Sequence, residues 1–150
     1  MRRRPEWLSA PIVMVLLPLA LPASTEAIER YTLRTQKPFA EVLEDLEFAI
    51  GEENFRLTGR AQIGAAIAER HGNDFPEAIV VHFCNLEYAR ALLQADANNL
   101  LYMPCRVSLR QQEAQVIVDA WLLPEDTGDA LALRREVNEV LRRIVRFAAR

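Results

Sequence analysis

The sequence has no excess of basic residues, which limits the partners it is expected to bind. Its 150 residues include 18 Lys and Arg against 21 Asp and Glu, a formal net charge of −3. Residues 1–27 contain three of the arginines and two of the glutamates, so the remainder has 15 basic and 19 acidic residues, a net charge of −4. Nucleic-acid-binding proteins usually concentrate a basic excess on one face. We therefore expect no nucleic-acid partner.

The common sequence signatures of catalysis are also missing. Gly59 and Gly64 have the spacing of a phosphate loop, but the Gly-Lys-Ser/Thr that completes this motif is absent. No Ser-His-Asp or Cys-His-Asn set is visible, although such sets can assemble from distant parts of a chain. Glu87, Asp96 and Asp119 are scattered and show no paired spacing. The pattern favours a non-enzymatic role and leaves a site assembled in space as an alternative.

After residue 27 no segment is long and apolar enough to span a membrane. The N-terminus itself has arginines at positions 2–4, an uncharged stretch over 8–23 and small residues before Ile28. That order is typical of a secretory signal peptide. A retained anchor is the alternative, but a spanning helix needs roughly 20 apolar residues, and this run is shorter and contains prolines.

These features predict a signal peptide over residues 1–27 and a single α+β domain over residues 28–150. Cleavage is expected before Ile28, with cleavage after Ala23 as the second choice. The mature protein is then periplasmic or extracellular, with no membrane span left after cleavage.

Hydrophobic periodicity in the rest of the chain predicts strands alternating with helices. We expect strands over residues 30–35, 54–60, 78–83, 105–109 and 115–122. We expect helices that begin after Pro38, at Ile63, after Asn85 and after Asp129. Asn85 and Asp129 suit helix N-caps, because their side chains accept hydrogen bonds from the first turn. The order β-α-β-(α)-β-α-β-β-α predicts an α+β two-layer sandwich, a mainly antiparallel sheet with helices packed on one face.

Three short segments are similar to a known family. They are Phe55-Arg56-Leu57-Thr58-Gly59-Arg60, then Val81-His82-Phe83-Cys84-Asn85-Leu86, then Met103-Pro104-Cys105-Arg106-Val107. From about Tyr31 to Leu123 the chain resembles the domain of unknown function 302 family. The resemblance implies a small α+β domain, often exported in bacteria, that forms a homodimer. Some members occur beside sulfur-oxidation proteins, and no particular activity is implied. Asn85 and Arg106 lie in these motifs and are candidate site residues.

Two cysteines in an exported protein make a disulfide between Cys84 and Cys105 a candidate. If the helix between their strands is a crossover, those strands run parallel and the thiols lie at opposite ends, too far apart to bridge. His82 and Cys84 are two residues apart on a strand and so project to one face. With Cys105 they form a candidate site for a metal or haem iron. The alternative is that both cysteines fill apolar space and His82 is a hydrogen-bonded strand residue.

Together these features predict an exported, non-enzymatic module that acts as a small-ligand-binding or accessory protein. Its expected partner is a small ligand or a periplasmic protein, and the resemblance implies a link to sulfur or redox metabolism. The alternative is a metal, haem or thiol-redox protein that uses Cys84, Cys105 and His82.

Overall fold

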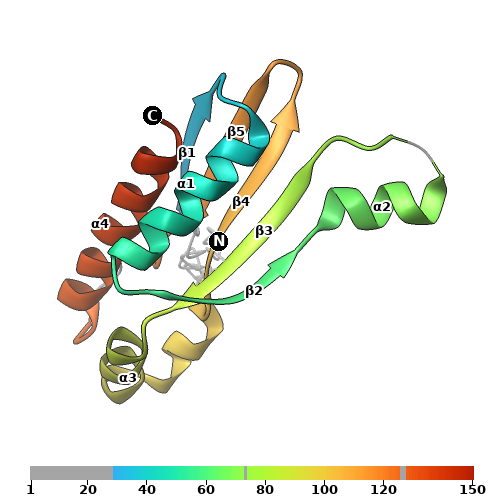
Figure 1. Ribbon diagram of the computed structural model, residues 1–150. Helices are drawn as coiled ribbons and strands as arrows, with labels where there is room; N and C mark the ends of the chain where they lie inside the picture. The colour runs from blue at the N-terminus through green and yellow to red at the C-terminus, as the bar shows by residue number, and fades with distance from the viewer. Residues whose placement is uncertain (1–28, 73, 126–127) are drawn as a thin grey trace, which may run out of the picture.

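The computed structural model describes residues 29–72, 74–125 and 128–150, and these form one five-stranded antiparallel sheet with helices (Figure 1). The strand order is β1-β5-β4-β3-β2. The strands are β1 Arg30–Thr35, β2 Arg56–Ala61, β3 Ala78–Cys84, β4 Cys105–Gln112 and β5 Gln115–Trp121. The helices are α1 Phe39–Glu52, α2 Ile63–His71, α3 Leu86–Ala95 and α4 Leu131–Ala148, with a 3-10 helix η1 over Ala97–Tyr102. The predicted α+β sandwich is confirmed.

The predicted signal peptide over 1–27 lies outside the described residues. Within the described ranges, none of the helices is both long enough and apolar enough to cross a membrane.

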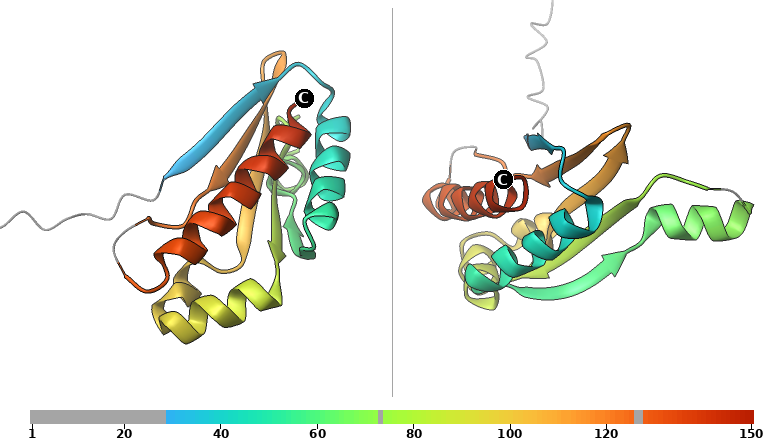
Figure 2. Two further views of the ribbon diagram at one scale, coloured as in Figure 1. Left: turned by 90° about the vertical axis from the view of Figure 1, so that its left-hand side faces the viewer. Right: turned by 45° about the horizontal axis from the view of Figure 1, so that its top comes forward.

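Helices α1 and α4 cover one face of the sheet (Figure 2). Strand side chains alternate between the two faces, so Ile79, Val81 and Phe83 of β3 point into the core while His82 between them does not. The amphipathic stripe of α1 supplies Val42 and Leu46, among others, to the same core. Because both long helices lie on one side, the other face of the sheet has no helical cover from them.

Strands β3 and β4 are antiparallel, which corrects the parallel arrangement expected of a crossover. The connection between them, α3 and η1, lies at one end of the sheet and does not cross a face (Figure 1). The chain therefore re-enters the sheet at the end where it left. Consequently Cys105 pairs with Phe83, the residue next to Cys84.

Two smaller expectations are also corrected. Asp129 does not cap α4, because the N-cap position is Ala130 and no side chain caps there. Helical periodicity predicts that Ile63, Ala66 and Ile67 of α2 face inward, but Ile63 and Ala66 are exposed, and the buried residue of this helix is Gly64. Helix α2 lies beside β2 and β3 and away from α1 and α4 (Figure 1). Its apolar side chains therefore do not meet the core that α1 and α4 form with the sheet.

Gly64 allows α2 to pack closely on the start of β3. A Cβ built at Gly64 would lie 2.5 Å from the Pro76 carbonyl oxygen and 2.7 Å from the Ala78 amide nitrogen. Both are backbone atoms, so the helix itself has to move to make room.

We predict that Gly64→Ala lowers the free energy of unfolding by about 2 kcal/mol, as overpacking does. Gly51→Ala is the matched control, because a Cβ at Gly51 meets nothing within 4 Å in α1. It should be neutral or stabilise by about 0.5 kcal/mol through helix propensity. Urea unfolding followed by circular dichroism measures both, and equal effects of the two substitutions would contradict the packing role.

Candidate functional site

Arginines are concentrated on the sheet face that α1 and α4 leave uncovered. The register places Arg30 opposite Trp121, and Arg34 opposite Ile117, which in turn lies opposite Arg110. Arg106 lies on the same face of β4, opposite His82. We call this surface the arginine face; it consists of Arg30, Arg34, Arg106 and Arg110 around a central Asp119.

Asp119 is a buried carboxylate in the middle of the arginine face. Its side chain is 3% exposed. It accepts a hydrogen bond from the Thr32 hydroxyl and another from the Arg110 guanidinium, and the Arg30 Nε lies 3.8 Å away. Thr32 and Ser108 are its partners in the register. The carboxylate thus offsets the charge of two arginines and holds them in place.

Arg106 differs from these two arginines, because its contact is with an aromatic ring. Its guanidinium carbon lies 4.8 Å from the centre of the Trp121 ring. Within residues 29–72, 74–125 and 128–150, Arg106 makes no ion pair. A guanidinium stacked on an indole keeps its N–H donors free for a carboxylate, sulfate or phosphate.

A pocket of about 280 Å³ lies next to this stacked pair. Its lining is Leu101, Tyr102, Pro104, Cys105, Arg106, Trp121, Leu122 and Leu123. Apolar side chains dominate the walls, and Arg106 is the charged member of the lining. Small-ligand pockets have this composition, mostly apolar with few polar groups that fix orientation.

The wall formed by η1 is held by a buried polar network. Asn99 is fully buried and donates hydrogen bonds to the carbonyl oxygens of Leu92 and Asp96 at 2.8 and 2.9 Å. Its side-chain oxygen accepts a hydrogen bond from the Arg134 Nε at 3.0 Å. The network ties η1 to α3 and α4, and so fixes the neighbouring Leu101 and Tyr102 at the pocket.

Cys84 and Cys105 are free thiols at the same end of the sheet. Both line a small cavity of about 20 Å³ together with Tyr88 and Met103. Burial, and then the nearby Cys84, raise the pKa of the Cys105 thiol to about 12. Burial also raises the pKa of Cys84. Both thiols are therefore protonated at neutral pH, and neither is an activated nucleophile.

His82, Cys84 and Cys105 do not share one face. Cys105 packs against the core, on the same side as its register partner Phe83, whereas His82 lies opposite Arg106 on the other face. In the part of the chain that the structure describes, no group of three or more His, Cys, Asp and Glu side chains is placed to hold a metal ion. The metal or haem site thus stays a prediction.

Asn85 caps α3. Its side-chain oxygen accepts hydrogen bonds from the amides of Glu87 and Tyr88 at 2.9 and 3.2 Å, and its amide nitrogen donates to the Asn54 carbonyl at 3.1 Å. The residue therefore orients the α3–η1 connection and does not line the 280 Å³ pocket.

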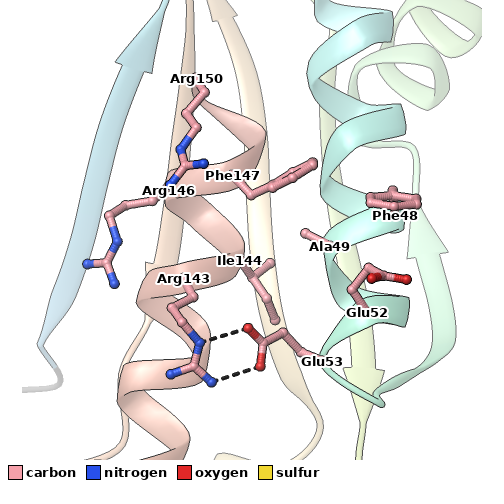
Figure 3. A pocket seen from close by; sticks show the side chains of 9 residues that line it. All are labelled: Phe48, Ala49, Glu52, Glu53, Arg143, Ile144, Arg146, Phe147 and Arg150. Carbon is pink, nitrogen blue, oxygen red and sulfur yellow. Dashed lines mark hydrogen bonds and ion pairs between the residues drawn. The ribbon is translucent and has the colours of Figure 1, made fainter.

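A second groove, of about 320 Å³, lies between α1 and α4 (Figure 3). Phe48 and Phe147 lie across it with ring centres 5.6 Å apart. At its other end Arg143 makes two hydrogen bonds to Glu53, at 2.7 and 2.8 Å. This pair neutralises the charge at that end, and Arg146 and Arg150 also line the groove.

Sequence inspection named Asp119 only as a scattered carboxylate and missed Trp121 and Asn99. The available signal was an Asp inside the otherwise apolar strand β5, since a charged residue at such a position needs a partner. Its partners come from β1 and β4, however, and strand order was not known. Trp121 carried no local motif that distinguishes it from a core residue.

Comparisons with known proteins give a family and a fold. The family model described as "Domain of unknown function DUF302" matches residues 31–150. A crystal structure of an uncharacterized conserved DUF302 protein from Bacillus stearothermophilus superposes with a TM-score of 0.70 at 20% sequence identity. The match covers 83% of this chain and all of that one. Among the curated proteins, none matches this sequence.

We predict that Asp119→Ala lowers the free energy of unfolding by about 2 kcal/mol, because the Thr32 hydroxyl and the Arg110 guanidinium lose their charged hydrogen-bond acceptor, while solvent screens the exposed arginines. Glu87→Ala is the control, since Glu87 forms an exposed pair with Arg90 whose loss costs well under about 1 kcal/mol. Chemical denaturation at low salt measures both. A loss for Asp119→Ala no larger than for Glu87→Ala would contradict the central role of this carboxylate.

Proposed function

The chain belongs to the DUF302 family, and we propose that it is a non-enzymatic module that binds a small amphiphilic anion in the pocket beside Trp121. One observation carries the proposal: a mostly apolar pocket contains one charged side chain, Arg106, which makes no ion pair within the described ranges. The apolar part of the ligand would fill the space between Leu101 and Trp121. Its acidic group would accept hydrogen bonds from the guanidinium of Arg106.

The groups available in this pocket support binding more than catalysis. Apart from Arg106, Tyr102 and Cys105 bring a hydroxyl and a thiol to the lining, and the raised pKa of Cys105 keeps its thiol protonated. A protonated thiol is a poor nucleophile and a poor general base at neutral pH. His82 lies next to Arg106 in the register but does not line the pocket.

Export and homodimer formation belong to the same proposal. They are supported by the N-terminal sequence pattern and by the resemblance to the family, respectively. An exported ligand-binding module of this kind would serve as an accessory protein to a periplasmic pathway, and a sulfur or redox pathway is the first to examine.

Trp121 can report binding directly, because the chain has only two tryptophans and the other is Trp7. In a Trp7→Phe background, octanoate and octanesulfonate should change Trp121 fluorescence saturably, and 1-octanol should bind more weakly. Arg106→Gln should raise Kd for both anions at least about tenfold, the value of a charged hydrogen bond.

Arg90→Gln is the matched control, since Arg90 is exposed on α3 and its ion partner is Glu87. It should leave Kd unchanged within about twofold. Equal affinity for octanol and octanoate, or equal effects of the two substitutions, would contradict the assignment of Arg106 as the anion-binding group.

A second candidate function is thiol redox chemistry, favoured by the antiparallel register that brings Cys84 beside Cys105. Oxidation of the two thiols would form one disulfide and release two protons and two electrons, with a dithiol–disulfide oxidase of the exporting compartment as electron acceptor. The disulfide would lock the ends of β3 and β4 next to the pocket wall.

Intact-mass measurement of the exported protein tests this candidate, because the oxidised form is lighter by two hydrogen atoms. The raised pKa values predict slow alkylation by iodoacetamide at pH 7.5, with Cys84 reacting before Cys105 and both accelerating at alkaline pH. A Cys84→Ala variant, which cannot form the bridge, is the control. An unchanged mass after treatment with an oxidised dithiol would rule the redox role out.

A further inference from the structure

The end of the sheet that carries Trp121 also carries exposed leucines. Leu100 and Leu101 of η1 are 63% and 78% exposed, and Trp121 is 43% exposed. Leu101 and Trp121 line the same pocket, so these two side chains are neighbours, and Leu100 precedes Leu101 in η1. Large apolar side chains gathered at one exposed end usually mark a contact surface.

Two arginines flank this apolar group. Arg30 lies opposite Trp121 in the register, and Arg106 stacks on the Trp121 ring. The Arg30 side chain is largely exposed. Glu29, the carboxylate next to Arg30 in the chain, lies 3.5 Å from Arg142 of α4 and is partly neutralised there.

We propose that this end of the domain docks on an anionic lipid surface, with Leu100, Leu101 and Trp121 inserted among the lipid headgroups and Arg30 and Arg106 on their phosphates. Leucine enters the apolar boundary, tryptophan favours the headgroup level, and arginine is attracted to anionic lipids. The docking surface is the set of these five residues. It goes beyond the proposed pocket, with which it shares Leu101, Arg106 and Trp121, and it rests on the proposed export, which places the domain beside a membrane.

The path of the chain supports a lipid surface as the occupant. The uncharged stretch over 8–23 precedes β1, and β1 begins at Arg30, within the docking surface. The intervening residues 24–29 span at most about 22 Å when fully extended. Until the expected cleavage before Ile28, the docking surface is therefore the part of the domain nearest a membrane that holds the apolar stretch.

Charge distribution supports the same orientation. Residues 28–150 carry a net charge of −4, so the molecule as a whole is repelled by an anionic surface. The arginine face has four arginines and one carboxylate, and its Arg30–Trp121–Arg106 row borders η1. The attraction is thus local, and it favours approach with this end first. An acidic protein partner would use the arginines but would leave the exposed leucines unexplained.

The test uses the exported protein carrying Trp7→Phe, with its N-terminus defined by intact mass. The protein is mixed, at about 0.1 M salt, with vesicles of phosphatidylcholine alone or of phosphatidylcholine with 30% phosphatidylglycerol. We expect a blue shift of Trp121 emission and co-sedimentation with the anionic vesicles, weakened by higher salt. Arg30→Gln should weaken partitioning about fivefold, and Leu100→Ser with Arg30→Gln at least about tenfold.

Matched controls lie on the helical side of the molecule. Phe48→Ser on α1 removes an exposed apolar side chain, and Arg146→Gln on α4 removes an arginine that makes no ion pair with the described residues. Both should leave partitioning within about twofold. Because all variants share one N-terminus, any binding by that segment is common to them and cancels in the comparison.

Three outcomes would overturn the proposal. The first is equal binding to vesicles with and without phosphatidylglycerol, and the second is equal partitioning of the Leu100/Arg30 variant and the controls. The third is binding of a dodecaglutamate peptide without binding to vesicles, which would indicate an acidic protein partner. Neither Leu100 nor Arg30 lines the pocket. The octanoate Kd of the double variant therefore stays at the wild-type value, and failure of vesicle docking is distinguishable from failure of the pocket.

Discussion

The carboxylate of Asp119 is the constraint on which the uncovered sheet face depends. Four arginines projecting from β1 and β4, on either side of β5, would repel one another and separate in water. A single buried carboxylate between them, bonded to Thr32 and Arg110 and near Arg30, makes their proximity tolerable. It does so without neutralising all of them. The face therefore keeps a positive excess on an acidic protein, and it is rigid because its arginines project from strands and not from loops.

The connection between β3 and β4 decides what lies next to this face. Because α3 and η1 stay at one end of the sheet, the chain returns antiparallel, and the segments around Cys84 and Cys105 meet there. The family-like motifs of the sequence are thus gathered at one end in space. Asn85 and the buried Asn99 hold the connection with hydrogen bonds to the backbone. The pocket is a consequence of where this connection lies, since η1 supplies one wall and β4 and β5 supply the other.

Local patterns predicted the elements well, because alternation and the helical stripe are properties of neighbouring residues. The β1 strand and the Asn85 cap were found in this way. Strand orientation was not, since about twenty residues with a helix suit both a crossover and a return at the same end. Asp119 could not be recognised as the centre of a cluster, because its partners lie on β1 and β4 and meet it only once the order β1-β5-β4 is known. Arg106 was singled out from its motif, but its partner Trp121 comes from another strand.

The cysteines illustrate how position in the fold changes the chemistry of a residue. Sequence alone made them candidate metal ligands, because Cys84 lies two residues from His82 on one strand and Cys105 could supply a third ligand. In the folded chain Cys105 packs against the core, and burial raises the pKa of its thiol, so the thiol keeps its proton at neutral pH and is a poor nucleophile. The same burial does not reduce its packing. Cys105 therefore contributes to the pocket mainly as an apolar wall, and the positive charge of Arg106 remains the feature that selects what enters.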